Sequence, residues 1–242
     1  MFPFRSSSLA VLSLCLLTAA CGDGCRTGFG IEPANPSGTP GASRAAPADP
    51  TAPPPRARVV VLGDSLTIGL GLVETQSYPS ILQTYVDRDG YAFEVVNAGV
   101  SGDTSAGGLR RLDWALEGNV RVLILALGAN DALRGLSIAD MKQNLTAIID
   151  RARERNIVVI LAGMEAPPNY GPEYVQSFRT AFREVAGRER VLMIPFLLDK
   201  VAGVSELNQA DGIHPNAEGA RIIANTVWPV LRSVLDQMVT SQ

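Results

Sequence analysis

The sequence predicts an α/β fold, a three-layer α/β/α sandwich in which helices cover both faces of a five-stranded parallel sheet. Two observations lead to this class. From Arg58 onward, short apolar runs alternate with longer amphipathic segments, which is the pattern of strand–helix–strand units. Several of the apolar runs, such as VVVL and VLILAL, are continuous, as expected for strands that are buried on both faces of a parallel sheet.

The apolar runs place the strands at residues 58–63, 92–97, 121–127, 157–162 and 190–195. The amphipathic segments between and after them predict helices at about 77–88, 105–117, 138–155, 173–187 and 216–238. In an open parallel sheet, ligands bind in the loops beyond the carboxyl ends of the strands. The segments GDS, AGVSGDT, GAND and MEAPPNYG follow the first four strands, so we expect them to meet at one edge of the sheet.

Residues 1–21 have the three parts of a secretory signal peptide. Arg5 supplies the positive charge, an apolar stretch follows, and small residues precede Cys21. LLTAAC also resembles a bacterial lipobox, in which Cys21 becomes the lipidated first residue and anchors the protein to a membrane, although Thr18 stands where leucine is commonest. The alternative is ordinary cleavage near Ala20 and a disulfide between Cys21 and Cys25. Either way we expect export to the periplasm or cell envelope.

Residues 22–57 are rich in Pro, Gly, Ala, Ser and Thr and contain almost no large apolar side chain. Such a segment predicts an extended, flexible linker that carries no chemistry. The remaining residues, 58–242, are numerous enough for one domain with a substantial hydrophobic core.

Composition excludes several classes of function. The net charge is −3 and the pI is about 5.3, without a basic cluster, so no nucleic-acid partner is expected. His214 is the single histidine, and all three cysteines precede residue 26. A multi-histidine or cysteine metal site and a catalytic thiol in the domain are therefore excluded. We expect no metal and no organic cofactor.

A serine hydrolase needs a nucleophile, a base, and a group that orients the base. Ser65 is the candidate nucleophile at the end of the first strand, and it lies outside any G-x-S-x-G motif, which disfavours the α/β-hydrolase fold. His214 is the only imidazole, and Asp211 lies three residues before it. The alternative interpretation is a simple turn at GDS and a structural or exposed histidine.

Such an enzyme also needs hydrogen-bond donors for the developing oxyanion. Gly102 has no side chain, so its N–H can approach a substrate closely. Asn130 offers a side-chain amide directly after a buried strand, and the N–H of Ser65 is a third donor. The alternative is that Asn130-Asp131 and Gly102-Asp103-Thr104 only cap helices, and that Asp64 and Asp103 hold loops through bonds to the backbone.

GDSL at 63–66, the glycine in NAGVSGDTS, the asparagine in GAND and the DGIHP near the end resemble the conserved blocks of the SGNH (GDSL) hydrolase family. The likeness is closest to its thioesterase I/arylesterase/lysophospholipase branch. The resemblance implies a flavodoxin-like fold, a triad of Ser65, Asp211 and His214, and an oxyanion hole of Ser65, Gly102 and Asn130.

The resemblance also implies small-molecule substrates with an acyl chain: aryl or acyl esters, lysophospholipids or thioesters. Loops 69–77, 131–137 and 166–172 are expected to line an acyl groove, with Leu70, Leu72, Leu133 and Tyr170 as candidates for substrate binding. The alternative role for these four side chains is packing in the core. Two other functions stay open: a carbohydrate O-deacetylase of the same family, and a non-catalytic lipid-binding envelope lipoprotein. We expect a monomer.

Overall fold

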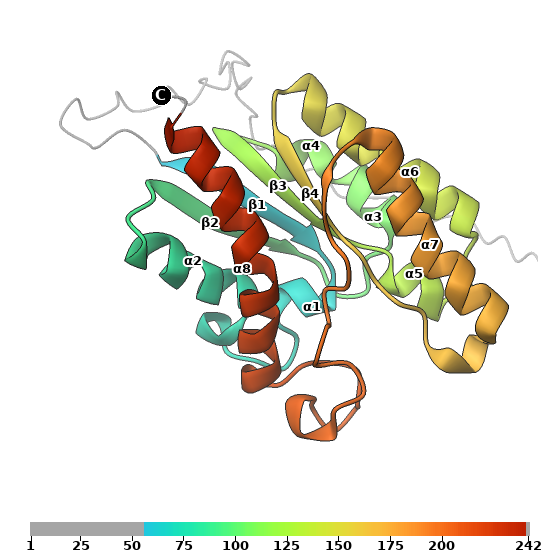
Figure 1. Cartoon of the computed structure of the whole chain (residues 1–242). Coiled ribbons are helices and arrows are strands. Elements are labelled where there is room, and N and C mark those ends of the chain that lie inside the picture. Colours follow the sequence, from blue (N-terminus) through green and yellow to red (C-terminus); the bar gives the residue numbers. More distant parts are fainter. Residues whose placement is uncertain (1–55, 241–242) are drawn as a thin grey trace, which may run out of the picture. The chain divides into compact units, whose positions relative to one another are not determined.

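The computed structural model describes residues 56–240, and their centre is a five-stranded parallel sheet (Figure 1). The predicted signal peptide, the lipobox and nearly all of the linker lie outside the described residues. The strands follow the predicted ranges to within two or three residues at each end. They are β1 (Ala57–Gly63), β2 (Phe93–Gly99), β3 (Val120–Ala126), β4 (Val158–Ala162) and β5 (Leu192–Ile194).

The strand order is β2-β1-β3-β4-β5, and every pair is parallel. This is the flavodoxin-like order, in which the chain crosses from one side of β1 to the other after β2. The crossing leaves a crevice beyond the carboxyl ends of β1 and β3, the usual ligand site of such sheets. The fold therefore places the loops after β1, β2 and β3 around one position.

Helices cover both faces of the sheet (Figure 1). On one face lie α2 (Tyr78–Arg88) and α8 (Ala217–Thr240). The other face carries α3 (Ser105–Arg110), α4 (Leu112–Ala115), α6 (Ile138–Glu154) and α7 (Pro172–Glu189). The short helices α1 (Ser65–Ile68) and α5 (Ala129–Leu133) follow β1 and β3 directly. Short 3₁₀ turns occur at η1 (Glu74–Gln76), η2 (Pro168–Tyr170) and η3 (Ser205–Leu207).

The continuous apolar runs form the central strands, as predicted. The last five residues of β1 and of β3 are buried, whereas β2 lies at an edge and is only partly buried. Helices of both layers contribute to the core, for example Leu82 of α2, Leu145 of α6, Phe182 of α7 and Leu231 of α8. Burial on two faces is the reason that the sequence of β1 and β3 does not alternate.

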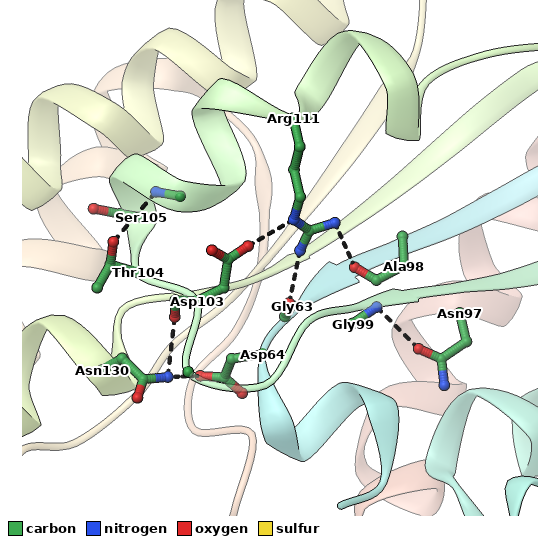
Figure 2. Close-up of polar contacts among 12 residues, drawn as sticks. Gly63, Asp64, Asn97, Ala98, Gly99, Asp103, Thr104, Ser105, Arg111 and Asn130 are labelled. Carbon is green, nitrogen blue, oxygen red and sulfur yellow. Dashed lines mark hydrogen bonds and ion pairs between the residues drawn. The ribbon is translucent and has the colours of Figure 1, made fainter. Parts of the chain in front are cut away.

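The predicted helix at 105–117 is in fact two helices, α3 and α4, separated at Arg111. Arg111 has φ −102° and ψ 8°, outside the helical region. Its side chain turns back toward the ends of β1 and β2 (Figure 2). Amphipathic periodicity did not reveal this break, because it depends on bonds to distant parts of the chain.

Candidate active site

The polar segments that follow the strands meet, as predicted, at the carboxyl edge of the sheet. They line a cavity of about 630 Å³ together with the loop that precedes α8. Ser65 comes from the loop after β1, Gly102 from the loop after β2, Asn130 from the loop after β3, and His214 from the last loop. Segments that are far apart in the sequence thus contribute to one site.

Ser65 is the first residue of α1, and only Asp64 separates it from the end of the buried strand β1. The Asp64 carboxylate caps this helix by accepting a hydrogen bond from the Leu66 N–H at 3.0 Å. A Cβ atom at Gly63 would lie 1.9 Å from Thr67 Oγ1. Glycine is therefore required at 63 because α1 packs closely against the strand end. The serine is presented at the sheet edge by a tight, capped strand–helix junction.

The side chains of Ser65, His214 and Asp211 form a chain of hydrogen bonds. Ser65 Oγ lies 2.9 Å from His214 Nε2, and His214 Nδ1 lies 2.7 Å from Asp211 Oδ2. The other carboxylate oxygen of Asp211 accepts the backbone N–H groups of Ile213 and His214, both at 3.0 Å. The N–H of His214, its ring and the N–H of Ile213 together lower the pKa of Asp211 to about 2. Asp211 is therefore a charged acceptor that fixes the orientation of the imidazole.

The loop that carries the histidine is closed by Gln209. Its backbone N–H donates to the His214 carbonyl at 2.8 Å, and its side-chain amide donates to the carbonyls of Pro215 and Leu70. The bond to Leu70 joins this loop to the segment after α1. Directly after this loop, the Asn216 side chain caps α8 by accepting from the N–H groups of Glu218 and Gly219.

Two of the predicted oxyanion donors are held by specific contacts. Gly102 has φ +77°, a left-handed conformation that favours glycine, and its carbonyl accepts a bond from Arg134 at 2.6 Å. The Asn130 side-chain amide donates to Asp64 Oδ2 and to the Asp103 carbonyl, both at 3.0 Å (Figure 2). The amide has two N–H groups, so one of these bonds must be shared or lengthened when Asn130 donates to a substrate oxygen.

Asp64 is almost completely buried, with 1 % of its surface exposed. Burial raises the pKa of its carboxyl to about 6, against the opposing effect of the hydrogen bonds from Leu66 and Asn130. Desolvation, which disfavours the charged carboxylate, thus outweighs the effect of these hydrogen bonds on the pKa. As expected from the sequence, Asp64 bonds to the backbone; its second bond, to Asn130, was not expected.

The other expected capping residues behave differently from one another. Thr104 caps α3 by accepting the Gly107 N–H. Asp131 does not cap its own helix, because its carboxylate accepts the N–H and the hydroxyl of Ser105, at the start of α3. The side chain of Asp103 forms an ion pair with Arg111 at 2.6 Å instead of bonding to the backbone.

The cavity is lined mainly by apolar side chains. Of the four residues predicted to bind substrate, Leu70 and Leu133 line it. Leu72 lines a separate small hollow beside Ser65 and His214, and the Tyr170 hydroxyl donates to the Leu133 carbonyl at 2.8 Å instead of lining the cavity. Four residues not predicted from the sequence complete the wall: Met164, Phe196, Leu198 and Ile213. Phe196 and Leu198 follow the fifth strand, and this position at the carboxyl edge of the sheet was the sequence signal for them.

Within residues 56–240, no three His, Cys, Asp or Glu side chains are grouped as metal ligands. Among the helices of this same part of the chain, none is both long and apolar enough to cross a bilayer. The cavity brings together a hydroxyl, an imidazole and amide donors, and the Asp211 carboxylate bonds to the imidazole. These are the parts required for acyl transfer through a serine.

Comparisons with known proteins show which family and which solved structures the chain is similar to. Residues 61–222 match the GDSL-like Lipase/Acylhydrolase family. The chain is 42 % identical over 178 residues to esterase TesA of Pseudomonas aeruginosa, a match that covers 73 % of this chain and 89 % of the relative. It is 33 % identical over 179 residues to the thioesterase 1/protease 1/lysophospholipase L1 of Escherichia coli K12, covering 74 % and 85 %.

A similar solved structure is that of the psychrotrophic esterase EstA from Pseudoalteromonas sp., inhibited by monoethylphosphonate. The TM-score is 0.70 at 33 % sequence identity, and the match covers 74 % of this chain and 98 % of that structure. The predicted α/β class is confirmed by this likeness and by the parallel sheet.

Proposed function

The chain belongs to the GDSL-like lipase/acylhydrolase family, and from this membership we propose that it is a serine esterase that cleaves carboxylic esters through an acyl-enzyme on Ser65. Its similarity to proteins named esterase and thioesterase/lysophospholipase makes it an enzyme that hydrolyses esters. The observation that carries the finer proposal is the continuous hydrogen-bond chain from Ser65 through His214 to Asp211.

In the first half of the reaction, His214 Nε2 accepts the proton of the Ser65 hydroxyl while Ser65 Oγ attacks the carbonyl carbon. The carbonyl oxygen becomes an oxyanion that accepts hydrogen bonds from the N–H groups of Ser65 and Gly102 and from the Asn130 amide. Each donor of this kind is worth about 10²–10³ in rate. The Asp211 carboxylate stabilises the charged imidazole. His214 then gives its proton to the leaving alcohol or thiol, and the acyl group stays on Ser65.

In the second half, His214 removes a proton from a water molecule, which attacks the acyl carbon. The same donors hold the second oxyanion, and the proton returns from His214 to Ser65 Oγ as the carboxylic acid leaves. The balance of atoms is one ester or thioester and one water consumed, and one carboxylic acid and the corresponding alcohol or thiol released. The catalytic groups named in both halves are side chains and backbone N–H groups of this chain.

Substrates with an acyl chain suit the apolar lining of the cavity, with Leu70, Leu133 and Ile213 beside the reacting groups. Aryl and acyl esters and lysophospholipids come first. Thioesters are a further class, as the name of the Escherichia coli relative indicates for that protein. Acyl-CoA ranks lower because the predicted signal peptide directs the chain out of the cytoplasm, where that thioester chiefly occurs.

A carbohydrate O-deacetylase is less well supported. Of the described residues that line the cavity, one is a phenylalanine and none is a tyrosine or tryptophan, so few aromatic faces are available for stacking on a sugar. Hydrolysis rates of p-nitrophenyl esters, from the acetate to longer acyl chains, are measured beside the rate on acetylated xylan. This comparison separates an acyl esterase from a carbohydrate O-deacetylase. A non-catalytic lipid-binding lipoprotein does not agree with membership in a hydrolase family.

The assignment of Ser65 is tested with a fluorophosphonate probe and a soluble p-nitrophenyl ester. Ser65→Ala should abolish both covalent labelling and turnover, because the attacking oxygen is removed. Ser101, the other serine that lines the cavity, supplies the matched control, and Ser101→Ala should still be labelled. Labelling of the Ser65→Ala protein at the wild-type rate would refute the assignment.

The location of the enzyme follows from the predicted signal at residues 1–21. Export, with an anchor on a lipidated Cys21, would hold the enzyme at a membrane from which lipid esters are available. The linker at 22–57 has a reach of roughly 100 Å if it is extended, enough to separate the domain from the membrane surface.

A further inference from the structure

The side chain of Arg111 connects three segments that lead into the candidate active site (Figure 2). Its Nε donates to Asp103 Oδ2 at 2.6 Å, one terminal nitrogen donates to the Ala98 carbonyl at 2.8 Å, and the other donates to the Gly63 carbonyl at 2.9 Å. Only 17 % of the Arg111 side chain and 13 % of the Asp103 side chain are exposed. Arg111 does not line the cavity.

Two of these bonds hold residues that lie close in sequence to an oxyanion donor. Gly63 is two residues before Ser65, and Asp103 directly follows Gly102. The Asp103 carbonyl also accepts the Asn130 amide at 3.0 Å. One guanidinium group therefore fixes the strand end that carries Ser65 and, through Asp103, the loop that carries Gly102 and the acceptor of Asn130.

We propose that Arg111 is a positioning residue that holds the three oxyanion donors in the geometry required for catalysis. The inference rests on the proposed acyl transfer at Ser65 and assigns to it a residue outside the cavity. Arg111 touches neither substrate nor reacting atoms, and it acts through Gly63, Asp103 and Asn130.

Arginine suits this role for two physical reasons. Its planar guanidinium presents five N–H donors in a rigid arrangement, which lets it bind two carbonyls and a carboxylate at once; the flexible ammonium of lysine cannot reproduce this. The Asp103 carboxylate balances its charge, so the group can be largely buried between the strand ends. Small errors in the position of a donor matter, because a displacement of about 1 Å can cost about 10²-fold in rate.

A purely structural role predicts lower thermal stability and unchanged catalysis by each folded molecule. The test therefore compares Arg111→Lys and Arg111→Met with the wild type on a soluble p-nitrophenyl ester, well below the melting temperature. Folded active sites are counted by fluorophosphonate labelling at completion. The exposed neighbour Arg110 gives the matched controls, Arg110→Lys and Arg110→Met.

We expect kcat per labelled site to fall by about 10²-fold in Arg111→Met and less in Arg111→Lys, with KM changed by less than about threefold. The inhibition constant of a trifluoromethyl ketone, which forms an oxyanion on a serine, should rise in proportion to the loss of kcat/KM. The Arg110 variants should resemble the wild type in all three measurements.

The proposal is overturned if kcat per labelled site and trifluoromethyl ketone affinity stay at the wild-type level while only the melting temperature falls. If Arg111→Met does not fold, the same comparison is decided by Arg111→Lys and by Asp103→Asn, which removes the ion pair and keeps the Asp103 carbonyl. Failure of the acyl-transfer proposal itself is recognised separately, because Ser65→Ala would then remain active.

Discussion

Two carboxylates near Ser65 differ in acidity because their surroundings differ. Asp211 is partly exposed and accepts three N–H groups, and these hydrogen bonds lower its pKa to about 2. Asp64 is buried, and desolvation raises its pKa to about 6. Asp211 thus remains charged throughout the range in which a histidine can act as a base, whereas Asp64 changes its protonation within that range or just below it.

These shifts affect stability in opposite directions. For Asp211, whose pKa is lowered on folding, stability is fully present above about pH 4 and is lost as the pH falls toward 2. Asp64 binds its proton more tightly in the folded state than in the unfolded state. Between about pH 4 and pH 6, the folded protein therefore holds more protons at Asp64, and stability falls as the pH rises.

This predicts the pH dependence of an Asp64→Asn variant. A shift of the Asp64 pKa from 3.8 to about 6 corresponds to a change in the unfolding free energy of at most about 3 kcal/mol. We expect the unfolding free energy of the wild type, relative to that of Asp64→Asn, to decrease by up to about this amount between pH 4 and pH 7. Urea titrations of both proteins at pH 4 and pH 7 measure this difference in unfolding free energy. The two proteins share every other titrating group, so a difference that stays constant with pH would contradict the prediction.

At the level of elements, the strand–helix junction after β1 determines where Ser65 lies. The Gly63 carbonyl accepts Arg111, and the Asn97 amide at the end of β2 donates to the Thr67 carbonyl of α1 at 2.9 Å. In the same helix, Thr67 Oγ1 shares a hydrogen bond with the buried Tyr78 hydroxyl of α2 at 2.8 Å. The helix that presents the nucleophile is thus fixed from three directions, and its close packing leaves no room for a side chain at Gly63.

We therefore predict that Gly63→Ala destabilises the protein. The added methyl group would overlap Thr67 and approach the Ala126 carbonyl to 3.0 Å, and overpacking of this kind costs about 1–3 kcal/mol. Gly187 in α7 is the control, because nothing lies within 4 Å of the place that an added Cβ atom would take. Gly187→Ala should stabilise by about 0.5–1 kcal/mol. Denaturant unfolding measures the change in unfolding free energy in both variants. Equal changes in Gly63→Ala and Gly187→Ala would show that the close packing at Gly63 is unimportant.

At the scale of the whole molecule, the described domain follows a segment with the pattern of an exported lipoprotein. A lipobox uses Cys21 alone, whereas a disulfide needs both Cys21 and Cys25. The two interpretations therefore differ in what they predict for single substitutions.

We predict that Cys21→Ser moves the protein from the membrane fraction to the soluble fraction, whereas Cys25→Ser leaves it membrane-bound. Lipid attachment requires the Cys21 thiol, and membrane fractionation followed by labelling with a radioactive fatty acid measures it. Soluble wild-type protein without label, together with a shift of mobility on reduction that either substitution removes, would instead establish the disulfide.

Much of the fold could be predicted from local patterns. Strands buried on both faces are continuous in hydrophobicity, and amphipathic helices repeat with the helical period, so the five strands and the long helices were found within a few residues of their ends. The separate helices α3 and α4 were not found, because the interruption at Arg111 depends on acceptors at Gly63 and Ala98, 48 and 13 residues away. Short-range periodicity contains no information about such partners.

The sequence by itself determined the α/β class, the family resemblance and the identity of Ser65, Gly102, Asn130, Asp211 and His214 as candidates, because each lies in a short motif beside a predictable strand or helix. Only the tertiary structure decided their geometry. Ser65 and His214 are 149 residues apart in sequence, yet Ser65 Oγ lies 2.9 Å from His214 Nε2. The loop before α8 that carries His214 is held beside the end of β1 by the bond from Gln209 to the Leu70 carbonyl. Three further outcomes were decided only by the tertiary structure. Asp64 bonds to Asn130, Leu72 and Tyr170 lie outside the cavity, and Arg111 bonds to the ends of β1 and β2 and to the loop after β2. These outcomes depend on long-range packing, in which side chains from distant segments satisfy one another's buried polar groups.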